Sequence, residues 1–368
     1  TILPGFIFSL GSIGIFENGI SATVELMVIL AVSAFVNNVI LNSWALTVKR
    51  VSRDILPSFS ALLVVQCLLI SLYILELNIH RSALIGLTGA SYGLASCIFQ
   101  LHSRLSFKFM SDAMFILFFF KSLLLMGALL FAAIAYNLSI GTIFILASIC
   151  LTILGSAGLF FSKLRNDDEK AKSEPFNFKI KNFSAGFLMS FRINGIILLP
   201  YYFGEQENLS VITFALFLMR PLSLIFTVAS PLIYKLIDEN KLSGNMNAIF
   251  LKISAIYSII AAGGGLAITQ SPGETGSLIY IFSILILFFQ VNLGFFRNIV
   301  EYRYIIADDL VPLILSASLG IVFLLLSLTT LAYFEKLPFL IVGLLISELA
   351  YCGGLMNSNF SKNGKINS

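Results

Sequence analysis

The chain is predicted to be an all-α, polytopic membrane protein with about 12 transmembrane helices in two six-helix lobes around a central cavity. Composition is the first reason. Hydrophobic residues make up 58% of the 368 residues and charged residues only 11%, whereas a soluble domain carries about 25% charged residues to cover its surface. The second reason is spacing, because the apolar residues form runs of roughly 20, the length that crosses the hydrocarbon core as a helix.

Short polar segments separate these runs and mark the points where each helix leaves the membrane. The spans predicted in the first half are residues 1–16, 22–44, 56–76, 82–100, 112–134 and 139–162. The spans predicted in the second half are residues 183–203, 209–234, 246–268, 277–295, 307–333 and 337–355.

A polar segment divides these spans into two groups of six. It predicts an N-terminal lobe over 1–162, a cytoplasmic linker over 163–182, a C-terminal lobe over 183–355 and a cytoplasmic tail over 356–368. The linker has the mixed-charge composition of a solvated segment, because it cannot bury itself. Two bundles joined in this way are expected to rock against each other.

The placement of Lys and Arg supports the count independently, because short cytoplasmic loops collect positive charge. Alternate polar segments hold 18 of the 23 basic residues, and the intervening ones hold only Arg81 and Lys336. Both termini are therefore expected in the cytoplasm. The 18 are Lys49, Arg50, Arg53, Arg104, Lys108, Lys163, Arg165, Lys170, Lys172, Lys179, Lys181, Lys235, Lys241, Lys252, Arg297, Arg303, Lys362 and Lys365.

Signatures of enzymes and cofactor sites are missing from the sequence. No G-x-x-x-x-G-K nucleotide loop occurs, and the two histidines, His80 and His102, lack a partner at metal-ligand spacing. The exported loops are too short to build an extramembrane active site. We expect no enzyme activity, no cofactor and no metal, and the net charge of +4 needs no nucleic-acid partner.

Among the ionisable residues of the predicted spans, five are candidates for a functional role: the cations Lys121, Arg192 and Arg220, and the carboxylates Glu25 and Glu348. A charge at mid-bilayer costs about 2.5 to 3.5 kcal/mol on insertion scales, so such residues usually face a partner or a wet cavity. The three cations are candidates for binding an anionic substrate. The alternative is that each one pairs with a neighbouring helix or extends to the interface.

Several segments carry a resemblance to a known family. They are Asn42–Arg50, Phe99–Lys108, Phe191–Gly204, Phe214–Pro221 and Ala229–Pro231. Together with the layout of the spans, they resemble the multidrug/oligosaccharidyl-lipid/polysaccharide exporter superfamily, and within it the Wzx-like polysaccharide flippases. The resemblance implies two lobes facing a cavity that moves undecaprenyl-diphosphate-linked oligosaccharides across the bacterial inner membrane. A polysaccharide polymerase and a chain-length regulator are the expected protein partners.

On this hypothesis Lys121, Arg192 and Arg220 hold the anionic head of the lipid-linked sugar. Asn194 and Gln290 are candidates for bonding sugar hydroxyls, with helix–helix hydrogen bonding as the alternative.

Glu25 and Glu348 are candidates for ion or proton coupling. A cation-coupled drug or metabolite exporter and an integral-membrane glycan polymerase remain alternative functions. Drug exporters resembling this fold use acids in the first, seventh or eighth helix, and those predicted spans contain no Asp or Glu.

Overall fold

The computed structural model describes most of the predicted membrane helices. The described residues are 19–45, 55–75, 81–107, 139–165, 180–202, 209, 212–219, 222, 244–268, 274–306, 309–333 and 340–366. They are almost entirely helical, and no strand occurs among them, so the all-α prediction is confirmed for this part of the chain.

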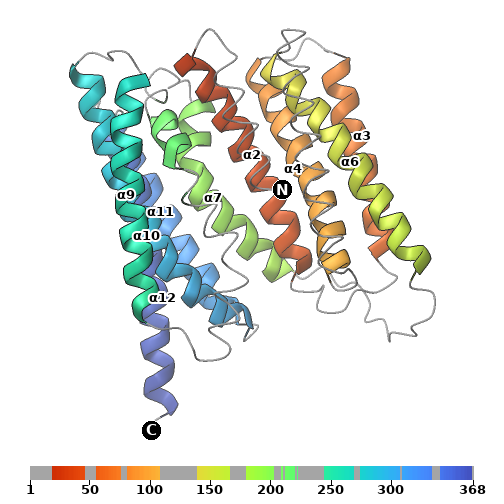
Figure 1. Cartoon of the computed structure of the whole chain (residues 1–368). Helices are drawn as coiled ribbons and strands as arrows, with labels where there is room; N and C mark the ends of the chain where they lie inside the picture. The colour runs from red at the N-terminus through yellow and green to blue at the C-terminus, as the bar shows by residue number, and fades with distance from the viewer. Residues whose placement is uncertain are drawn as a thin grey trace. The chain divides into compact units, whose positions relative to one another are not determined.

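The helices of the described residues fall where the apolar runs predict them (Figure 1). Their bounds are α2 Gly19–Ala45, α3 Ile55–Ile74, α4 Arg81–Phe107, α6 Ile140–Arg165, α7 Ile180–Tyr202, α9 Gly244–Ile268, α10 Glu274–Ile306, α11 Val311–Tyr333 and α12 Ile341–Ile366. The predicted spans 1–16 and 112–134, and most of 209–234, lie outside the described residues. The total of 12 spans therefore stays a prediction.

Five of the described helices are long and apolar enough to cross a membrane. The spanning segments are Arg81–Phe99, Ile140–Ala157, Ile180–Tyr202, Leu278–Phe295 and Val311–Tyr333. Shorter apolar segments occur at Val24–Ile40, Ser60–Ile74, Leu251–Gly263 and Ile341–Asn357. Large apolar side chains are exposed along α3, α9 and α11. Lipid covers such surfaces without cost, so the chain has the features of a membrane protein.

The chain divides into two compact units, residues 1–187 and 188–368. The division falls inside α7, a few residues beyond the predicted linker. The predicted arrangement of two six-helix lobes around a cavity concerns both units together and stays a prediction.

In the first unit, α4 packs against α2, α3 and α6. Glycines allow the backbones to approach closely: a Cβ at Gly89 would lie 2.7 Å from the Cβ of Val32, and one at Gly93 would lie 2.6 Å from the carbonyl oxygen of Ser33. Small residues four apart provide this kind of contact in membranes, where apolar burial does not drive helices together. The α2–α4 contact therefore depends on these two glycines.

A buried polar contact joins α3 to α4 in the same unit. Gln66 Nε2 donates a hydrogen bond to Ser91 Oγ over 3.0 Å, and neither residue is exposed. On the α6 side of α4, the rings of Tyr92 and Phe144 meet edge to face with centroids 4.9 Å apart. Directional contacts of these two kinds fix α4 against its neighbours.

In the second unit, α12 packs against α11 and α10, and α9 packs against α10. The α11–α12 contact is close, because a Cβ at Gly354 would lie 2.7 Å from Ser316 Oγ. At the α9–α10 contact, the Tyr280 hydroxyl donates to the carbonyl oxygen of Ala261 over 2.6 Å. This arrangement brings side chains of α10 and α12 together in the interior of the unit.

Candidate functional site

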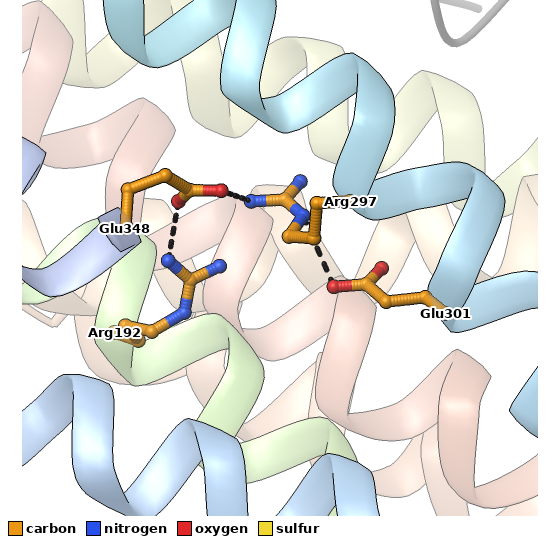
Figure 2. Close-up of polar contacts among 4 residues, drawn as sticks. All are labelled: Arg192, Arg297, Glu301 and Glu348. Atoms are coloured by element: carbon orange, nitrogen blue, oxygen red, sulfur yellow. Dashed lines mark hydrogen bonds and ion pairs between the residues drawn. The ribbon is translucent and has the colours of Figure 1, made fainter. Parts of the chain in front are cut away.

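Four charged side chains from three helices meet in the interior of the second unit (Figure 2). Arg192 comes from α7, Arg297 and Glu301 come from α10, and Glu348 comes from α12. We call these four residues the charge network. They carry two positive and two negative charges, so the network is neutral as a whole.

Glu348 is the centre of the charge network, because its two carboxylate oxygens bind different guanidinium groups. Oε2 accepts a hydrogen bond from Nη1 of Arg192, and Oε1 accepts one from Nη1 of Arg297 over 2.8 Å. On α10 itself, Nε of Arg297 lies 3.0 Å from Oε1 of Glu301, four residues further along the helix. Arg297 therefore lies between two carboxylates, as Figure 2 shows.

The charge network is fully buried at Arg192 and Glu348 and slightly exposed at Arg297 and Glu301. The side chains of Arg192 and Glu348 are 0% exposed, whereas those of Arg297 and Glu301 are 12% and 10% exposed. Taking an ion out of water costs several kcal/mol, which is recovered only by good pairing. The fully buried pair thus depends most strongly on its counter-charges.

The surroundings of Arg192 are specific to its side chain. The ring of Tyr351 lies with its centroid 4.2 Å from Cζ of Arg192, in a cation–π contact. On α11, a Cβ at Gly320 would lie 2.6 Å from Cδ of Arg192, so the absence of a side chain there leaves room for the arginine. Nε and Nη2 of Arg192 have no hydrogen-bond partner within the described part of the chain.

Two residues predicted for different roles are therefore in direct contact. Arg192 is a predicted substrate-binding cation and Glu348 a predicted coupling carboxylate, and the structure joins them in one ion pair. Arg192 has no exposed surface, and Glu348 occupies its Nη1 donor. In this conformation an anion in solution does not reach Arg192.

The other predicted binding residues are not part of the charge network, or they lie outside the residues that the structure describes. Lys121 and Arg220 lie outside the described residues. Asn194 is buried on α7, and its Nδ2 donates to the carbonyl oxygen of Ser190 over 2.9 Å, one turn back on the same helix. Gln290 is half-buried in the spanning part of α10. The predicted roles of Lys121 and Arg220 in binding the anionic head of the substrate, and of Asn194 and Gln290 in bonding sugar hydroxyls, stay predictions.

Glu25 belongs to the first unit and is separate from the charge network. Its carboxylate on α2 pairs with Arg81 at the start of α4. Arg81 is 79% exposed, so the pair lies at a surface of the unit. A pair of this kind is screened by its surroundings and holds α2 to α4 only weakly.

Sequence reasoning missed Arg297 and Glu301. It placed Arg297 in a cytoplasmic polar segment that follows the apolar run ending near residue 295. The apolar span of α10 does end at Phe295, but Arg297 is helical, because α10 continues to Ile306. The side of the membrane on which Arg297 lies stays a prediction. The spacing of Arg297 and Glu301 was the available signal, since opposite charges four residues apart pair on one face of a helix. That signal predicts a continuous helix and a local ion pair, but not the partner on α12.

The described residues contain no cluster of three or more His, Cys, Asp or Glu side chains that could hold a metal ion. What the charge network provides is an internal counter-charge for each buried guanidinium group.

Comparisons with known proteins found no relative: no family model matches the chain, and neither a curated protein nor a solved structure matches it.

Proposed function

We propose that this protein is a transporter that moves an undecaprenyl-diphosphate-linked oligosaccharide from the cytoplasmic to the periplasmic leaflet of a bacterial inner membrane. Three features support the proposal. The described chain is built of apolar helices, several of them long enough to span a bilayer. The basic residues alternate between polar segments in the manner of a multi-pass protein. The sequence also resembles the Wzx-like flippases.

The buried charge network is the observation that carries the proposal. Apolar side chains and small residues are sufficient to pack helices in a membrane, and ions cost free energy there. Ionisable groups inside membrane helices usually lie on substrate or ion pathways. A network joining α7, α10 and α12 therefore favours a transporter, whose helices move relative to one another, over a protein that only anchors a chain in the membrane.

The role proposed for Arg192 follows from its burial. With Glu348 on one side and the Tyr351 ring nearby, Arg192 meets an anionic substrate only in a conformation in which the charge network has rearranged. In the conformation described, Arg192 positions α7 against α12. Lys121 and Arg220 remain the proposed first contacts of the diphosphate, because this chemistry requires fixed positive charge.

Ion coupling through Glu348 is less well supported. Two guanidinium groups contact its carboxylate, and nearby opposite charges favour the ionised form of an acid. Glu348 would exchange protons only after losing both partners. This is the reason for ranking a cation-coupled exporter below the flippase.

The experiment that tests the proposal uses the purified protein in liposomes that contain a fluorescent undecaprenyl-diphosphate oligosaccharide. Movement between leaflets is measured by adding a membrane-impermeant quencher. We expect the protein to speed translocation and Arg192→Ala to slow it by at least about fivefold, since coupling free energies between a binding site and a conformational change are typically about 1 to 3 kcal/mol, a factor of about 5 to 150. Ile193→Ala is the matched control, because Ile193 is exposed on the same helix and should leave the rate unchanged.

Three results would contradict the proposal. Translocation at the rate of empty liposomes would remove the flippase function. Ion-gradient-driven uptake of a cationic dye, without lipid movement, would favour the exporter. Formation of long glycan chains from added repeats would favour the polymerase.

A further inference from the structure

The guanidinium group of Arg192 is surrounded by residues of other helices. On α12, the Glu348 carboxylate and the face of the Tyr351 ring contact it. On α11, Gly320 leaves room for the stem of the side chain, because a Cβ there would lie 2.6 Å from Cδ of Arg192. We call Glu348, Tyr351 and Gly320 the Arg192 site.

Contacts with α10 hold this site in place independently of α7. Arg297 donates to Oε1 of Glu348 over 2.8 Å, on the carboxylate oxygen that Arg192 does not use (Figure 2). Glu301 interacts with Tyr351. Helix α12 also packs extensively against both α10 and α11, whereas among the described helices α7 has no packing of comparable extent with α11 or α12. The Arg192 side chain therefore enters a site that other helices have built.

The helices that build the site supply an excess negative charge. Helices α10 and α12 contribute two carboxylates to the charge network, Glu301 and Glu348, but one guanidinium group, Arg297. Their share of the network is therefore one negative charge, and Arg192 from α7 neutralises it. A buried excess charge is costly unless a counter-ion meets it. The site thus requires one monovalent cation.

The chemistry of the site favours an organic cation over a metal ion. The face of an aromatic ring attracts a cation within about 6 Å of the ring centroid, and the Tyr351 centroid lies 4.2 Å from Cζ of Arg192. Calcium and magnesium instead take about six or more oxygen ligands. In the described ranges, no three His, Cys, Asp or Glu side chains come together in a way that could hold a metal.

Polar groups at the border of the site are left without partners by Arg192. The carbonyl oxygen of Ser347 would lie 3.0 Å from a Cβ at Gly320, so Ser347 borders the site. Its hydroxyl is buried and, like Nε and Nη2 of Arg192, has no hydrogen-bond partner among the described residues. Such groups cost free energy. A cation that is not attached to α7 can turn its donors toward an acceptor that the attached guanidinium does not use.

We propose that Glu348, Tyr351 and Gly320 form a binding site for a monovalent organic cation of the guanidinium class, and that Arg192 is its tethered occupant. A free cation of this class and the Arg192 side chain exclude each other, because both require the Glu348 carboxylate and the face of the Tyr351 ring. The site needs no lipid-linked substrate, so it is independent of the proposed transport.

The test measures ethylguanidinium binding to Arg192→Ala, which removes the tethered occupant and keeps the rest of the site. Thermal unfolding of the purified protein in detergent is followed at increasing ethylguanidinium chloride and constant ionic strength. A ligand that binds only the folded state raises the unfolding midpoint. We expect a saturable rise for Arg192→Ala. We expect none for the wild type or for Arg192→Lys, in which a tethered cation still occupies the site.

Further substitutions in the Arg192→Ala background identify the groups that bind. Glu348→Gln removes the excess negative charge and should weaken ethylguanidinium binding by at least about tenfold. Tyr351→Leu should weaken it by about tenfold through loss of the cation–π contact, and Tyr351→Phe, which keeps the ring, should bind more tightly than Tyr351→Leu. The matched control is Ile193→Ala with Arg192 in place, because Ile193 is exposed on the same helix and its removal should create no binding.

Arg192→Ala should fold, because Glu348 keeps its hydrogen bond from Arg297. If the variant is recovered folded only when ethylguanidinium is present, that result also supports the site. Failure to recover it with or without the cation would reject the inference.

Four other outcomes would overturn the inference: no saturable rise in Arg192→Ala, an equal rise in the wild type, binding that Glu348→Gln leaves unchanged, or an equal rise with sodium chloride alone. Saturable cation binding without lipid translocation would reject the proposed function alone. Lipid translocation by a protein whose Arg192→Ala variant binds no cation would reject this site alone.

Discussion

Removing the carboxylate of Glu348 should destabilise the protein much more than removing the guanidinium of Arg192, although the two groups form one pair. In Glu348→Gln, the amide oxygen can still accept a hydrogen bond, but both arginines lose their shared negative charge. Arg192 is then a fully buried cation without a counter-ion. Removing one partner of a buried pair costs about 3 to 5 kcal/mol.

In Arg192→Met the same pair is broken with a smaller penalty. Glu348 keeps its 2.8 Å hydrogen bond from Arg297, so no buried charge is left alone. The substitution also removes Nε and Nη2, which lack partners among the described residues. A buried unsatisfied donor costs about 1 to 3 kcal/mol, so its removal offsets part of the loss. We expect a net destabilisation of about 0 to 2 kcal/mol.

The measurement is equilibrium unfolding in mixed micelles with increasing sodium dodecyl sulfate, followed by far-ultraviolet circular dichroism. The double variant Arg192→Met with Glu348→Met is the control. It removes a neutral pair and leaves Arg297 with Glu301, so it should be more stable than Glu348→Gln alone. The reasoning is refuted if Glu348→Gln unfolds within about 1 kcal/mol of the wild type, or if Arg192→Met is the less stable single variant.

Two further predictions concern packing and the peripheral ion pair. Gly320→Ala should destabilise the protein by about 1 to 3 kcal/mol in the same unfolding assay, because its Cβ would overlap the Arg192 side chain and approach the carbonyl oxygen of Ser347. Gly263→Ala is its control, since no atom lies within 4 Å of a Cβ there, and equal effects of the two substitutions would contradict the packing argument. Arg81→Ala should change stability by at most about 1 kcal/mol, because Arg81 is largely exposed; a larger loss would mean that its pair with Glu25 is a structural element of the α2–α4 contact.

The sequence was sufficient to locate the described helices, because a membrane imposes a length and an apolar composition on each span. The predicted ranges 183–203 and 307–333 overlap α7 and α11 almost completely. Helix ends were predicted less well. The helix α10 continues past its apolar run, because intrahelical hydrogen bonds and the pair between Arg297 and Glu301 stabilise it without lipid contact.

The partners of the charged residues were not predictable from the sequence. Arg192 and Glu348 are separated by 156 residues, and periodicity within one helix carries no information about which helix it packs against. The open alternative, that each cation pairs with a neighbouring helix, describes Arg192 in the structure. The sequence did not identify Glu348 as the partner of Arg192, and it did not predict that Glu348 pairs with two arginines.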